Sequence, residues 1–490
     1  MVFSSLTFLF AFLPVFFLCY FLLGKLFGIR GKNIALFLFS LVFYAWGEPV
    51  YVLLMVYSTI LDYTCGRMIE AGEKKGRPKQ KKAFLTVSMI GNLALLAVFK
   101  YLTMMIGTAN TLFGTLLPVP EIVLPIGISF YTFQTMSYSI DVYRGKVEAQ
   151  HDFINFGAYV AMFPQLIAGP IVRYEAVAAQ LNQRTETLED FAAGARRFIV
   201  GLGKKVLIAN TMAQTADALF ENPASSLGSL GAWVAILAYT FQIFFDFSGY
   251  SDRAIGLGRM MGFHYTENFN YPYIASSVTE FWRRWHITMS SFFRDYIYIP
   301  MGGSRVSRPR WILNIFVVWF LTGLWHGASW NFVLWGLYFG FLLVLEKLVF
   351  RKWLEKGKIL PHVWSLFFIV YGWVIFTQET LGGLWEYTKA LFGGYGFLGT
   401  AQNNAVILLQ RADVNTVFFL MFAAAVLFSM PFSGWLKRKL RLEPAGDQPV
   451  PATRALVCGI LLDTGLILIL LLCTVQLVQG SYNPFIYFRF

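Results

Sequence analysis

The sequence predicts an all-α, polytopic integral membrane protein with about ten to twelve transmembrane helices and some shorter re-entrant or interfacial helices. Three observations lead to this prediction. Of the 490 residues, 57% are hydrophobic and 14% are charged, and the mean hydropathy is +0.57. Apolar runs of roughly 20 residues, long enough to cross a bilayer, recur along the whole chain. The basic residues gather between these runs.

The long apolar runs give the predicted spans in order. The clearest are residues 6–27, 34–63, 84–106, 312–345, 416–430 and 456–475. No basic segment precedes the first run, which continues past the length of a signal peptide, so we interpret it as an uncleaved span. The four cysteines lie in or beside apolar runs without metal-ligand spacing. Neither a disulfide framework nor a metal site is therefore expected.

Clusters of Lys and Arg indicate which loops face the cytoplasm. The net charge is +13, and the basic residues concentrate at 25–32, 67–82, 351–358 and 437–441. By the positive-inside rule these loops are cytoplasmic. One span precedes the first cluster and one follows the last, so both termini are expected on the extracytoplasmic side. The positive charge therefore reflects topology and contact with the lipid bilayer, and no nucleic-acid partner is expected.

The chain is predicted to form one domain, residues 1–490, whose composition changes in the middle. Residues 1–123 and 346–490 are typical of a scaffold of long helices. Between about residues 124 and 345, glycine, proline and polar residues interrupt aromatic sequence, as in "FPQLIAGPIVRY" and "FQIFFDFSGYSDRAIGLGRMMGF". Irregular backbone at membrane depth is tolerated only inside protein or along a cavity. We therefore place the catalytic core there.

His326 is the first candidate for chemistry. Residues 311–345 contain no Asp, Glu, Lys or Arg, and Tyr338 is the only other titratable side chain. A buried imidazole is neutral at rest, so it can accept a proton as the general base for a hydroxyl nucleophile. Gly323 and Gly327 would let a substrate or another backbone approach closely. The alternative is a histidine that only hydrogen-bonds a neighbouring helix.

A second candidate region is "TEFWRRWHITMSSFFRDYIYIP", residues 279–300, where charged and aromatic side chains alternate. Its arginines would meet an acidic or phosphorylated donor, and His286 would reach inward. We therefore assign His286 to catalysis. To substrate or donor binding we assign Arg283, Arg284, Trp285, Trp325 and Asp246. The alternative is an amphipathic helix lying at the membrane interface.

With "FWRRWHIT" followed by "LWHG", the sequence resembles the membrane-bound O-acyltransferase family, in the bacterial branch that O-acetylates alginate or D-alanylates teichoic acid. The resemblance implies that His326 is the central catalytic residue and that His286 supports it. It also implies a ring of helices around a central tunnel, in a multi-pass protein of the bacterial plasma membrane.

The resemblance also implies the partners of the reaction. The acyl donor would be a cytoplasmic thioester, either acetyl-CoA or an acyl carrier protein, and no bound cofactor is expected. In the alginate-type members the acyl group passes to an extracytoplasmic partner of the SGNH-esterase type, which modifies a polysaccharide. Acetyl is the acyl group that this branch favours.

The chain ends on "SYNPFIYFRF", residues 481–490, an aromatic tail that resembles the C-terminal peptide of the small D-alanylation subunit, where a tyrosine is the implied acyl relay. Tyr487 suits this role on chemical grounds. A phenol, with a pKa of about 10, is far easier to deprotonate than a sugar hydroxyl. Covalent relays also divide a difficult transfer into easier steps. The alternative is a tyrosine of the interfacial aromatic belt.

Two enzyme functions and one function of another class remain as alternatives to polysaccharide O-acetylation. The enzyme alternatives are D-alanyl transfer to teichoic acid and peptidoglycan O-acetylation. The other class is a transporter that carries an acylated molecule without forming bonds, because intramembrane histidines and broken helices also occur in transporters.

Overall fold

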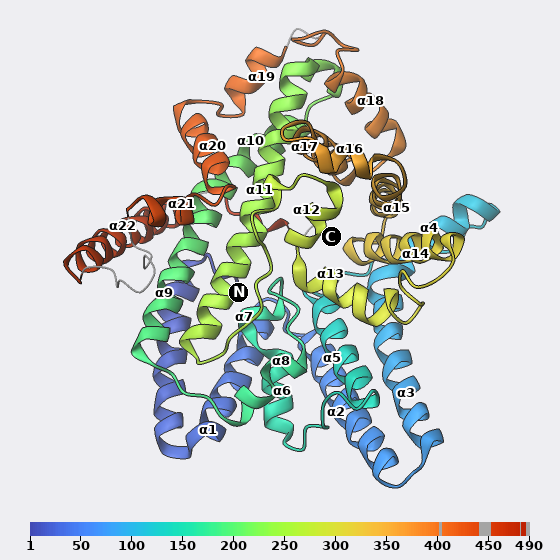
Figure 1. The fold of residues 1–490 in the computed structure, drawn as a ribbon, viewed down its shortest axis with the longest axis vertical. Coiled ribbons are helices and arrows are strands. Elements are labelled where there is room, and N and C mark those ends of the chain that lie inside the picture. Colours follow the sequence, from blue (N-terminus) through green and yellow to red (C-terminus); the bar gives the residue numbers. More distant parts are fainter. Residues whose placement is uncertain (401–403, 441–451, 481, 487–490) are drawn as a thin grey trace. The chain divides into compact units, whose positions relative to one another are not determined.

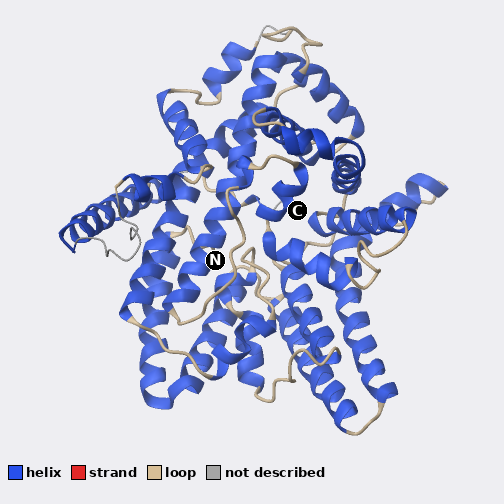
Figure 2. Ribbon diagram, viewed as in Figure 1, coloured by secondary structure: helices blue, strands red, loops and turns tan. Residues whose placement is uncertain are grey.

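The computed structural model describes the chain except for residues 401–403, 441–451, 481 and 487–490. The described part consists of helices and loops and contains no β-strand, which confirms the predicted all-α class (Figure 1, Figure 2). The helices group into two compact units. Unit 1 comprises Met1–Ala195 and Arg253–Glu267, and unit 2 comprises Arg196–Asp252 and the chain from Asn268 onward.

Unit 1 contains the helices of the N-terminal part of the chain, with short π-helical turns at η1 and η2. In order these are η1 (Phe8–Phe12), α1 (Leu13–Ala45), α2 (Val52–Lys74), α3 (Pro78–Leu96), η2 (Ala97–Tyr101), α4 (Leu102–Phe113), α5 (Ile128–Tyr143), α6 (Phe153–Ala161), α7 (Phe163–Leu166) and α8 (Tyr174–Asn182). Two helices belong to both units: α9 (Leu188–Gly203) and α11 (Ala224–Met260).

Unit 2 contains the remaining helices, and most of the predicted site residues belong to it. In order these are η3 (Lys204–Ala209), α10 (Asn210–Phe220), η4 (Pro272–Ile274), α12 (Val278–Arg284), α13 (Ile287–Phe293), η5 (Arg294–Tyr298), α14 (Arg308–His326), α15 (Trp330–Leu345), η6 (Glu346–Phe350), α16 (Arg351–Lys356), α17 (Leu360–Thr377), α18 (Leu381–Leu391), α19 (Ala405–Arg411), α20 (Thr416–Phe428), α21 (Phe432–Lys439) and α22 (Ala452–Val478).

A break divides α1 into two arms. Gly28 has φ 61° and ψ −146°, which no helical residue adopts, and it lies within the basic segment predicted to be a cytoplasmic loop. Phe16 packs on Phe39 with ring centroids 5.5 Å apart, and Phe8 packs on Phe43 at 5.9 Å. The two arms therefore run antiparallel as a helical hairpin, which agrees with a first span that ends before this loop.

Seven helices of the described residues are long and apolar enough to cross a membrane, or up to eight if α19 and α20, bent by 88°, form one span. One of the seven, Phe8–Ala45, contains both arms of the hairpin. The count falls below the predicted about ten to twelve crossings, because several apolar segments form short buried helices instead. For example, α5 has 16 residues and buries Gln134 and Asp141. The ring with its central tunnel stays a prediction.

The pairing of α14 with α15 holds the end of α14 in place. A Cβ atom added to Gly323 would lie 2.4 Å from the carbonyl oxygen of Phe332, and one added to Gly336 would lie 2.2 Å from that of Trp319. Only glycine permits such close backbone approach. The last residue of α14 is His326, so this tight packing fixes the backbone of the first candidate residue.

Candidate active site

His326 is enclosed by aromatic rings at the C-terminal end of α14. Its side chain is 7% exposed, and its ring centroid lies 4.8 Å from that of Trp335 and 5.6 Å from that of Phe376. These apolar surroundings disfavour a permanent charge on the imidazole. The carbonyl dipoles at a helix C-terminus, in contrast, favour positive charge, so they would stabilise the imidazolium that forms when His326 accepts a proton.

His286 occupies the break between α12 and α13. Its φ of 46° and ψ of 54° lie in the left-handed region, which few residues other than glycine adopt. The side chain is completely buried, and its Nδ1 lies 3.1 Å from Oδ1 of Asn268. The same oxygen accepts the backbone N–H of Thr288 at 3.3 Å. Since this oxygen is therefore an acceptor, Nδ1 of His286 carries the proton and Nε2 keeps the lone pair of the neutral ring.

Trp325 brings the two histidines together. Its ring centroid lies 5.7 Å from that of His286 and 5.0 Å from that of His326. Burial, and secondarily the nearby His326, lower the pKa of His286 well below its ordinary value, so its neutral form persists at physiological pH. Two residues predicted from separate motifs thus meet as a histidine pair around a third predicted residue, Trp325, all within unit 2.

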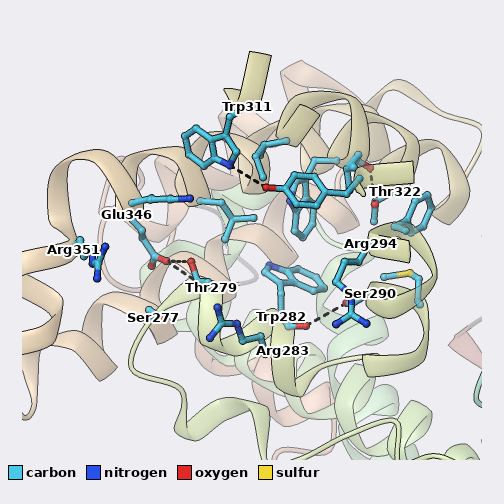
Figure 3. A pocket seen from close by; sticks show the side chains of 18 of the residues that line it. Ser277, Thr279, Trp282, Arg283, Ser290, Arg294, Trp311, Thr322, Glu346 and Arg351 are labelled. Carbon is cyan, nitrogen blue, oxygen red and sulfur yellow. Dashed lines mark hydrogen bonds between the residues drawn. The ribbon is translucent and has the colours of Figure 1, made fainter. Parts of the chain in front are cut away.

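Arg283 lines a cavity of about 710 Å³ in unit 2, with Arg294, Lys347 and Arg351 also on its wall (Figure 3). Arg294 pairs with its neighbour Asp295 at 2.7 Å, whereas Arg283 has no ion pair among the described residues. Hence the cavity offers at least one exposed guanidinium to an anion.

Two residues of the cavity wall, Thr322 and Trp282, lie close to the histidine pair. Thr322 lines it and lies one helical turn before His326 on α14. Trp282 lines it too, and this ring packs against Trp335 at 5.5 Å. Trp335 in turn contacts His326. The cavity wall and His326 are therefore joined through two packed indole rings, those of Trp282 and Trp335.

Two other predicted donor residues lie elsewhere. Arg284 pairs with Glu280 on its own helix at 2.8 Å, and its Nη1 donates to the carbonyl oxygen of Asn270. Trp285 is 2% exposed and packs among aromatic rings, including that of Trp373 at 5.1 Å. Neither lines the cavity, so the structure gives both of them packing or pairing contacts in place of a cavity position.

Asp246 lies beside the C-terminal segment and not in the wall of the cavity. It pairs with Lys205 at 2.9 Å, with both side chains almost fully buried, and its Oδ2 accepts the backbone N–H of Ile486 at 2.9 Å. Ile486 is the last described residue of the tail. Tyr487 lies outside the described residues, so its predicted role as a relay stays a prediction.

Sequence reasoning missed three residues that organise this region. Asn268 fixes the tautomer of His286, Lys205 pairs with Asp246, and Glu346 accepts the backbone N–H groups of Val278 and Thr279 at the start of α12. Lys205 and Glu346 are ionisable residues within largely apolar sequence, which is a usable signal. Asn268 sits in a loop, and nothing in its local pattern distinguishes it.

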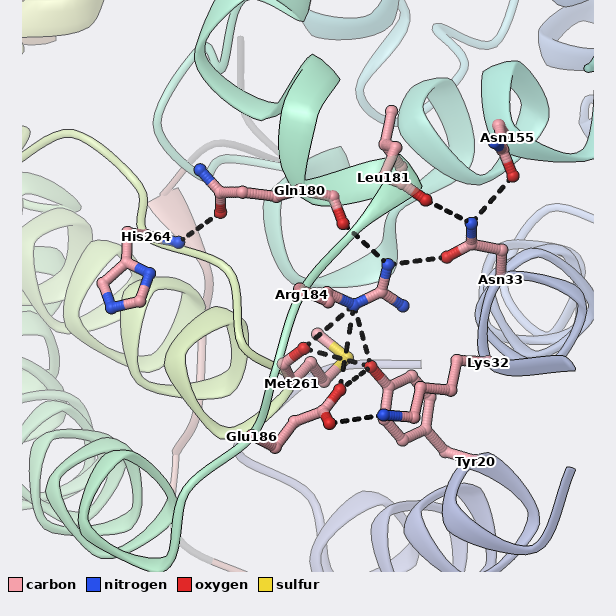
Figure 4. A network of polar contacts seen from close by, with 10 residues as sticks. All are labelled: Tyr20, Lys32, Asn33, Asn155, Gln180, Leu181, Arg184, Glu186, Met261 and His264. Carbon is pink, nitrogen blue, oxygen red and sulfur yellow. Dashed lines mark hydrogen bonds and ion pairs between the residues drawn. The ribbon is translucent and has the colours of Figure 1, made fainter. Parts of the chain in front are cut away.

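Another buried polar network lies in unit 1, around Arg184 (Figure 4). The guanidinium is 1% exposed. Its hydrogen-bond partners come from α1, α8 and the residue after α11, namely Tyr20, Asn33, Gln180 and Met261. Glu186 lies 3.9 Å away and also pairs with Lys32. Because acceptors and a carboxylate surround the charge, the Arg184 network ties unit 1 together.

Comparison with known proteins places these features in a family. The model of the membrane-bound O-acyltransferase family (MBOAT) matches residues 6–377. The chain is 44% identical over 424 residues to the probable alginate O-acetylase AlgI of Pseudomonas aeruginosa, covering 85% of this chain and 78% of the relative. It is 33% identical over 467 residues to a peptidoglycan O-acetyltransferase of Helicobacter pylori, covering 88% and 87%. A teichoic acid D-alanyltransferase of Bacillus subtilis is 28% identical over 284 residues, covering 54% and 71%. The chain therefore belongs to the membrane-bound O-acyltransferase family and is an O-acyltransferase.

Proposed function

We propose that the protein transfers an acetyl group from a cytoplasmic thioester, through the membrane, to an exported polysaccharide. The observation that carries the proposal is the buried histidine pair around Trp325, next to a cavity with an exposed arginine. A neutral imidazole held between aromatic rings can serve as a general base for a hydroxyl nucleophile. Because the chain is an O-acyltransferase, the alternative of a transporter that forms no bonds is wrong.

The first chemical step would join the acetyl group to an oxygen. His326 takes the proton of the attacking hydroxyl group, and the oxygen of that hydroxyl bonds to the thioester carbonyl carbon. The carbon–sulfur bond then breaks, and the imidazolium returns the proton to the departing thiolate. The products are an oxygen ester and a free thiol, and nothing is oxidised or reduced. The end of the α14 dipole would stabilise the intermediate imidazolium.

His286 would support this step from the other side of Trp325. Its Nδ1–H is committed to Asn268, so Nε2 is the ring atom that carries the lone pair of the neutral imidazole. The neutral state of His286 also avoids a second positive charge beside His326, which would oppose protonation of that base. We therefore propose His286 as the supporting residue.

The donor would enter at the cavity lined by Arg283. Both candidate donors, acetyl-CoA and an acyl carrier protein, carry the thioester on a phosphorylated arm, and a guanidinium binds phosphate well. The cavity wall includes Lys347 and Arg351, next to the basic segment 351–358 that the positive-inside rule assigns to the cytoplasm. This supports a cytoplasmic donor. We propose a multi-pass protein of the bacterial plasma membrane with both termini extracytoplasmic.

The hydroxyl nucleophile of the first step would be the phenol of Tyr487. An aryl ester is more reactive than an alkyl ester because phenolate is the better leaving group, so acetyl-tyrosine could pass its acyl group to a serine without further energy input. The acceptor serine would belong to an extracytoplasmic partner of the SGNH-esterase type. That partner would then esterify the polysaccharide and release free serine.

Two relatives indicate which polymer receives the acetyl group. The identity with the alginate O-acetylase supports an exopolysaccharide. The identity of 33% over most of both chains with the peptidoglycan O-acetyltransferase supports peptidoglycan as the second candidate. D-alanyl transfer has weaker support, because that relative matches 54% of this chain. Acetate released by mild alkali from each purified polymer would distinguish these candidates.

The decisive variant for the enzyme mechanism is His326→Ala in the full chain. With radiolabelled acetyl thioester, removal of a general base should lower acyl transfer roughly 10²- to 10⁴-fold. His362→Ala is the matched control, because His362 is exposed at the start of α17 in the same unit. Wild-type transfer by His326→Ala, with the protein still in the membrane, would rule out the proposed base.

The relay is tested separately by Tyr487→Phe, which removes one hydroxyl. We expect polymer acetylation to stop while the protein remains folded and still binds donor. Mass spectrometry of the C-terminal peptide, from cells lacking the downstream partner, should show an added acetyl mass on the wild-type tail. Normal polymer acetylation in Tyr487→Phe would leave the aromatic-belt interpretation in place of the relay.

A further inference from the structure

The C-terminal segment, residues 482–486, is bound by charged groups buried inside unit 2. Lys205 donates a hydrogen bond from Nζ to the carbonyl oxygen of Pro484. Asp246 accepts the backbone N–H of Ile486 at 2.9 Å. Lys205 and Asp246 also pair with each other, and their side chains are 2% and 1% exposed.

This arrangement explains why a charge pair is buried here. Removal of two ions from water costs several kcal/mol per ion, and their mutual attraction repays it only when further hydrogen bonds are made. On Lys205 and Asp246 the backbone of the tail supplies such bonds, one to each ion. The pair therefore has the chemistry of a binding site for a peptide backbone.

Further contacts hold the same segment in place. Asn210 donates to the side-chain oxygen of Asn483 at 3.2 Å, and the hydroxyl of Tyr482 donates to Asp217 at 2.7 Å. Phe485 packs against Tyr250 with ring centroids 5.3 Å apart. These contacts recognise side chains, whereas the charge pair recognises the backbone.

The helix that binds the tail also supports the histidine pair. On α11, Phe247 directly follows Asp246, and its ring meets that of His286 edge-on at 4.7 Å. Ser251 on the same helix accepts a hydrogen bond from Asn268, the residue that sets the tautomer of His286. The tail and the imidazole therefore share one stretch of α11, residues 246–251.

From these contacts we propose that Lys205 and Asp246 are positioning residues that form a docking site for the chain's own C-terminal segment. The site holds Ile486, and hence the chain immediately before Tyr487, against the stretch of α11 that supports His286. This inference rests on the proposed function for the role of the tail in acyl transfer. The docking itself is a separate claim and is tested without any acyl donor.

Docking is measured in the full chain as protection of a thiol. Ile486 is 1% exposed, so the cysteine of Ile486→Cys should react slowly with a water-soluble maleimide while the tail is docked. Asp246→Asn or Lys205→Met removes one charge-assisted hydrogen bond, which corresponds to about a 10- to 100-fold shift in equilibrium. We therefore expect labelling at position 486 to accelerate about 10- to 100-fold, as read by mass spectrometry of the C-terminal peptide.

The chain provides a matched control and an internal check. Asp252 on α11 pairs with Lys204, the neighbour of Lys205, at 2.7 Å and is not one of the groups that bind the described part of the tail. Asp252→Asn should leave labelling at position 486 unchanged. The native Cys65 and Cys473 are 2% and 0% exposed, so their labelling reports general unfolding.

Two outcomes of the labelling experiment would overturn the docking site, and one outcome of an acyl-transfer assay would overturn its positioning role. In the first, Asp246→Asn labels position 486 no faster than Asp252→Asn does. In the second, Asp246→Asn also accelerates labelling of Cys65 and Cys473, which means that the pair stabilises the protein in general and not the tail. In the third, an acyl-transfer assay gives a changed KM for the thioester with an unchanged kcat. A positioning role for the docked tail requires a lower kcat with an unchanged KM for the thioester, because the donor cavity does not include Asp246. If no variant transfers acetyl at all but the labelling result holds, the proposed function fails and the docking site stands.

Discussion

The Arg184 network of unit 1 and the histidine pair of unit 2 are both buried polar clusters, but they treat charge in opposite ways. Arg184 keeps a permanent positive charge, with four oxygens within 3.1 Å and a carboxylate 3.9 Å away. His286 and His326 are surrounded mainly by aromatic rings, and the pKa of His286 is lowered. A buried charge surrounded by acceptors therefore holds neighbouring helices in place, whereas a buried imidazole kept neutral can still take up a proton.

Substitution of Arg184 is expected to have the largest effect, a loss of unfolding free energy. Arg184→Met leaves Asn33 and the carbonyl oxygen of Met261 without their cationic partner and leaves Glu186 paired with Lys32 alone. Loss of a buried charged partner costs about 3–5 kcal/mol of unfolding free energy. Activity per folded molecule should not change, because no donor or acceptor residue is involved. The measurement is thermal unfolding in detergent together with acyl transfer normalised to folded protein. Arg259→Met, which disrupts a half-exposed pair with Asp190 in the same unit, should change little. Equal destabilisation by both variants would contradict this view of Arg184.

Substitution of Asn268, the partner of His286, is expected to have the next largest effect, on the rate of acyl transfer. Asn268→Ala removes the acceptor that fixes Nδ1–H of His286, so the imidazole loses its tautomer and orientation. We expect acyl transfer to fall about 10- to 100-fold, because the buried Nδ1–H of His286 loses its acceptor, a loss of about 1–3 kcal/mol. Ser251→Ala is the control, because it removes only a hydroxyl bonded to the Asn268 amide. If Asn268→Ala reduced stability but left the rate per folded molecule intact, Asn268 would be structural only.

The smallest expected effect is a pH dependence of the free energy of unfolding, which the neutral His286 contributes and Arg184 does not. The folded pKa of His286 lies below its ordinary value, about 6.5. Between that value and the folded pKa, the unfolded chain binds more protons. The free energy of unfolding should therefore fall on acidification, by up to about 1.4 kcal/mol per pH unit. Above about pH 6.5 this contribution is constant.

Thermal unfolding at about pH 7.5 and about pH 5.5 would measure this loss. His286→Gln should remove the part of the pH dependence that His286 contributes, whereas Arg184→Met should leave it unchanged. An unchanged slope in His286→Gln would show that another group carries the acid sensitivity.

The sequence predicted the class of protein and the identity of the histidine pair more fully than it predicted contacts. Apolar runs and basic loops indicated a helical membrane protein, and the isolated imidazole in residues 311–345 singled out His326. Both signals are local, because hydropathy and charge need no knowledge of distant residues. The resemblance implied roles for both histidines, whereas their shared contact with Trp325 comes from the structure alone.

Partners far apart in the chain escaped prediction. Asp246 was assigned to the donor from its motif, yet the structure pairs it with Lys205 and with Ile486, 240 positions away. Arg283 and Arg284 have the same local sequence context, but one lines the cavity and the other bonds to Glu280. Which face of a short helix meets which neighbour depends on tertiary packing, and a seven-residue helix such as α12 carries too few turns to reveal it.

In the π-helical turn η3, two neighbouring lysines pair with different carboxylates. Lys204 reaches Asp252 and Lys205 reaches Asp246, two carboxylates six positions apart on α11. A π turn accommodates one extra residue in a helix, so deletion of a single residue there would restore ordinary α-helical spacing and rotate every later side chain. The number of residues in η3, and not only their identity, thus determines whether the ammonium group of Lys205 faces the C-terminal segment 482–486.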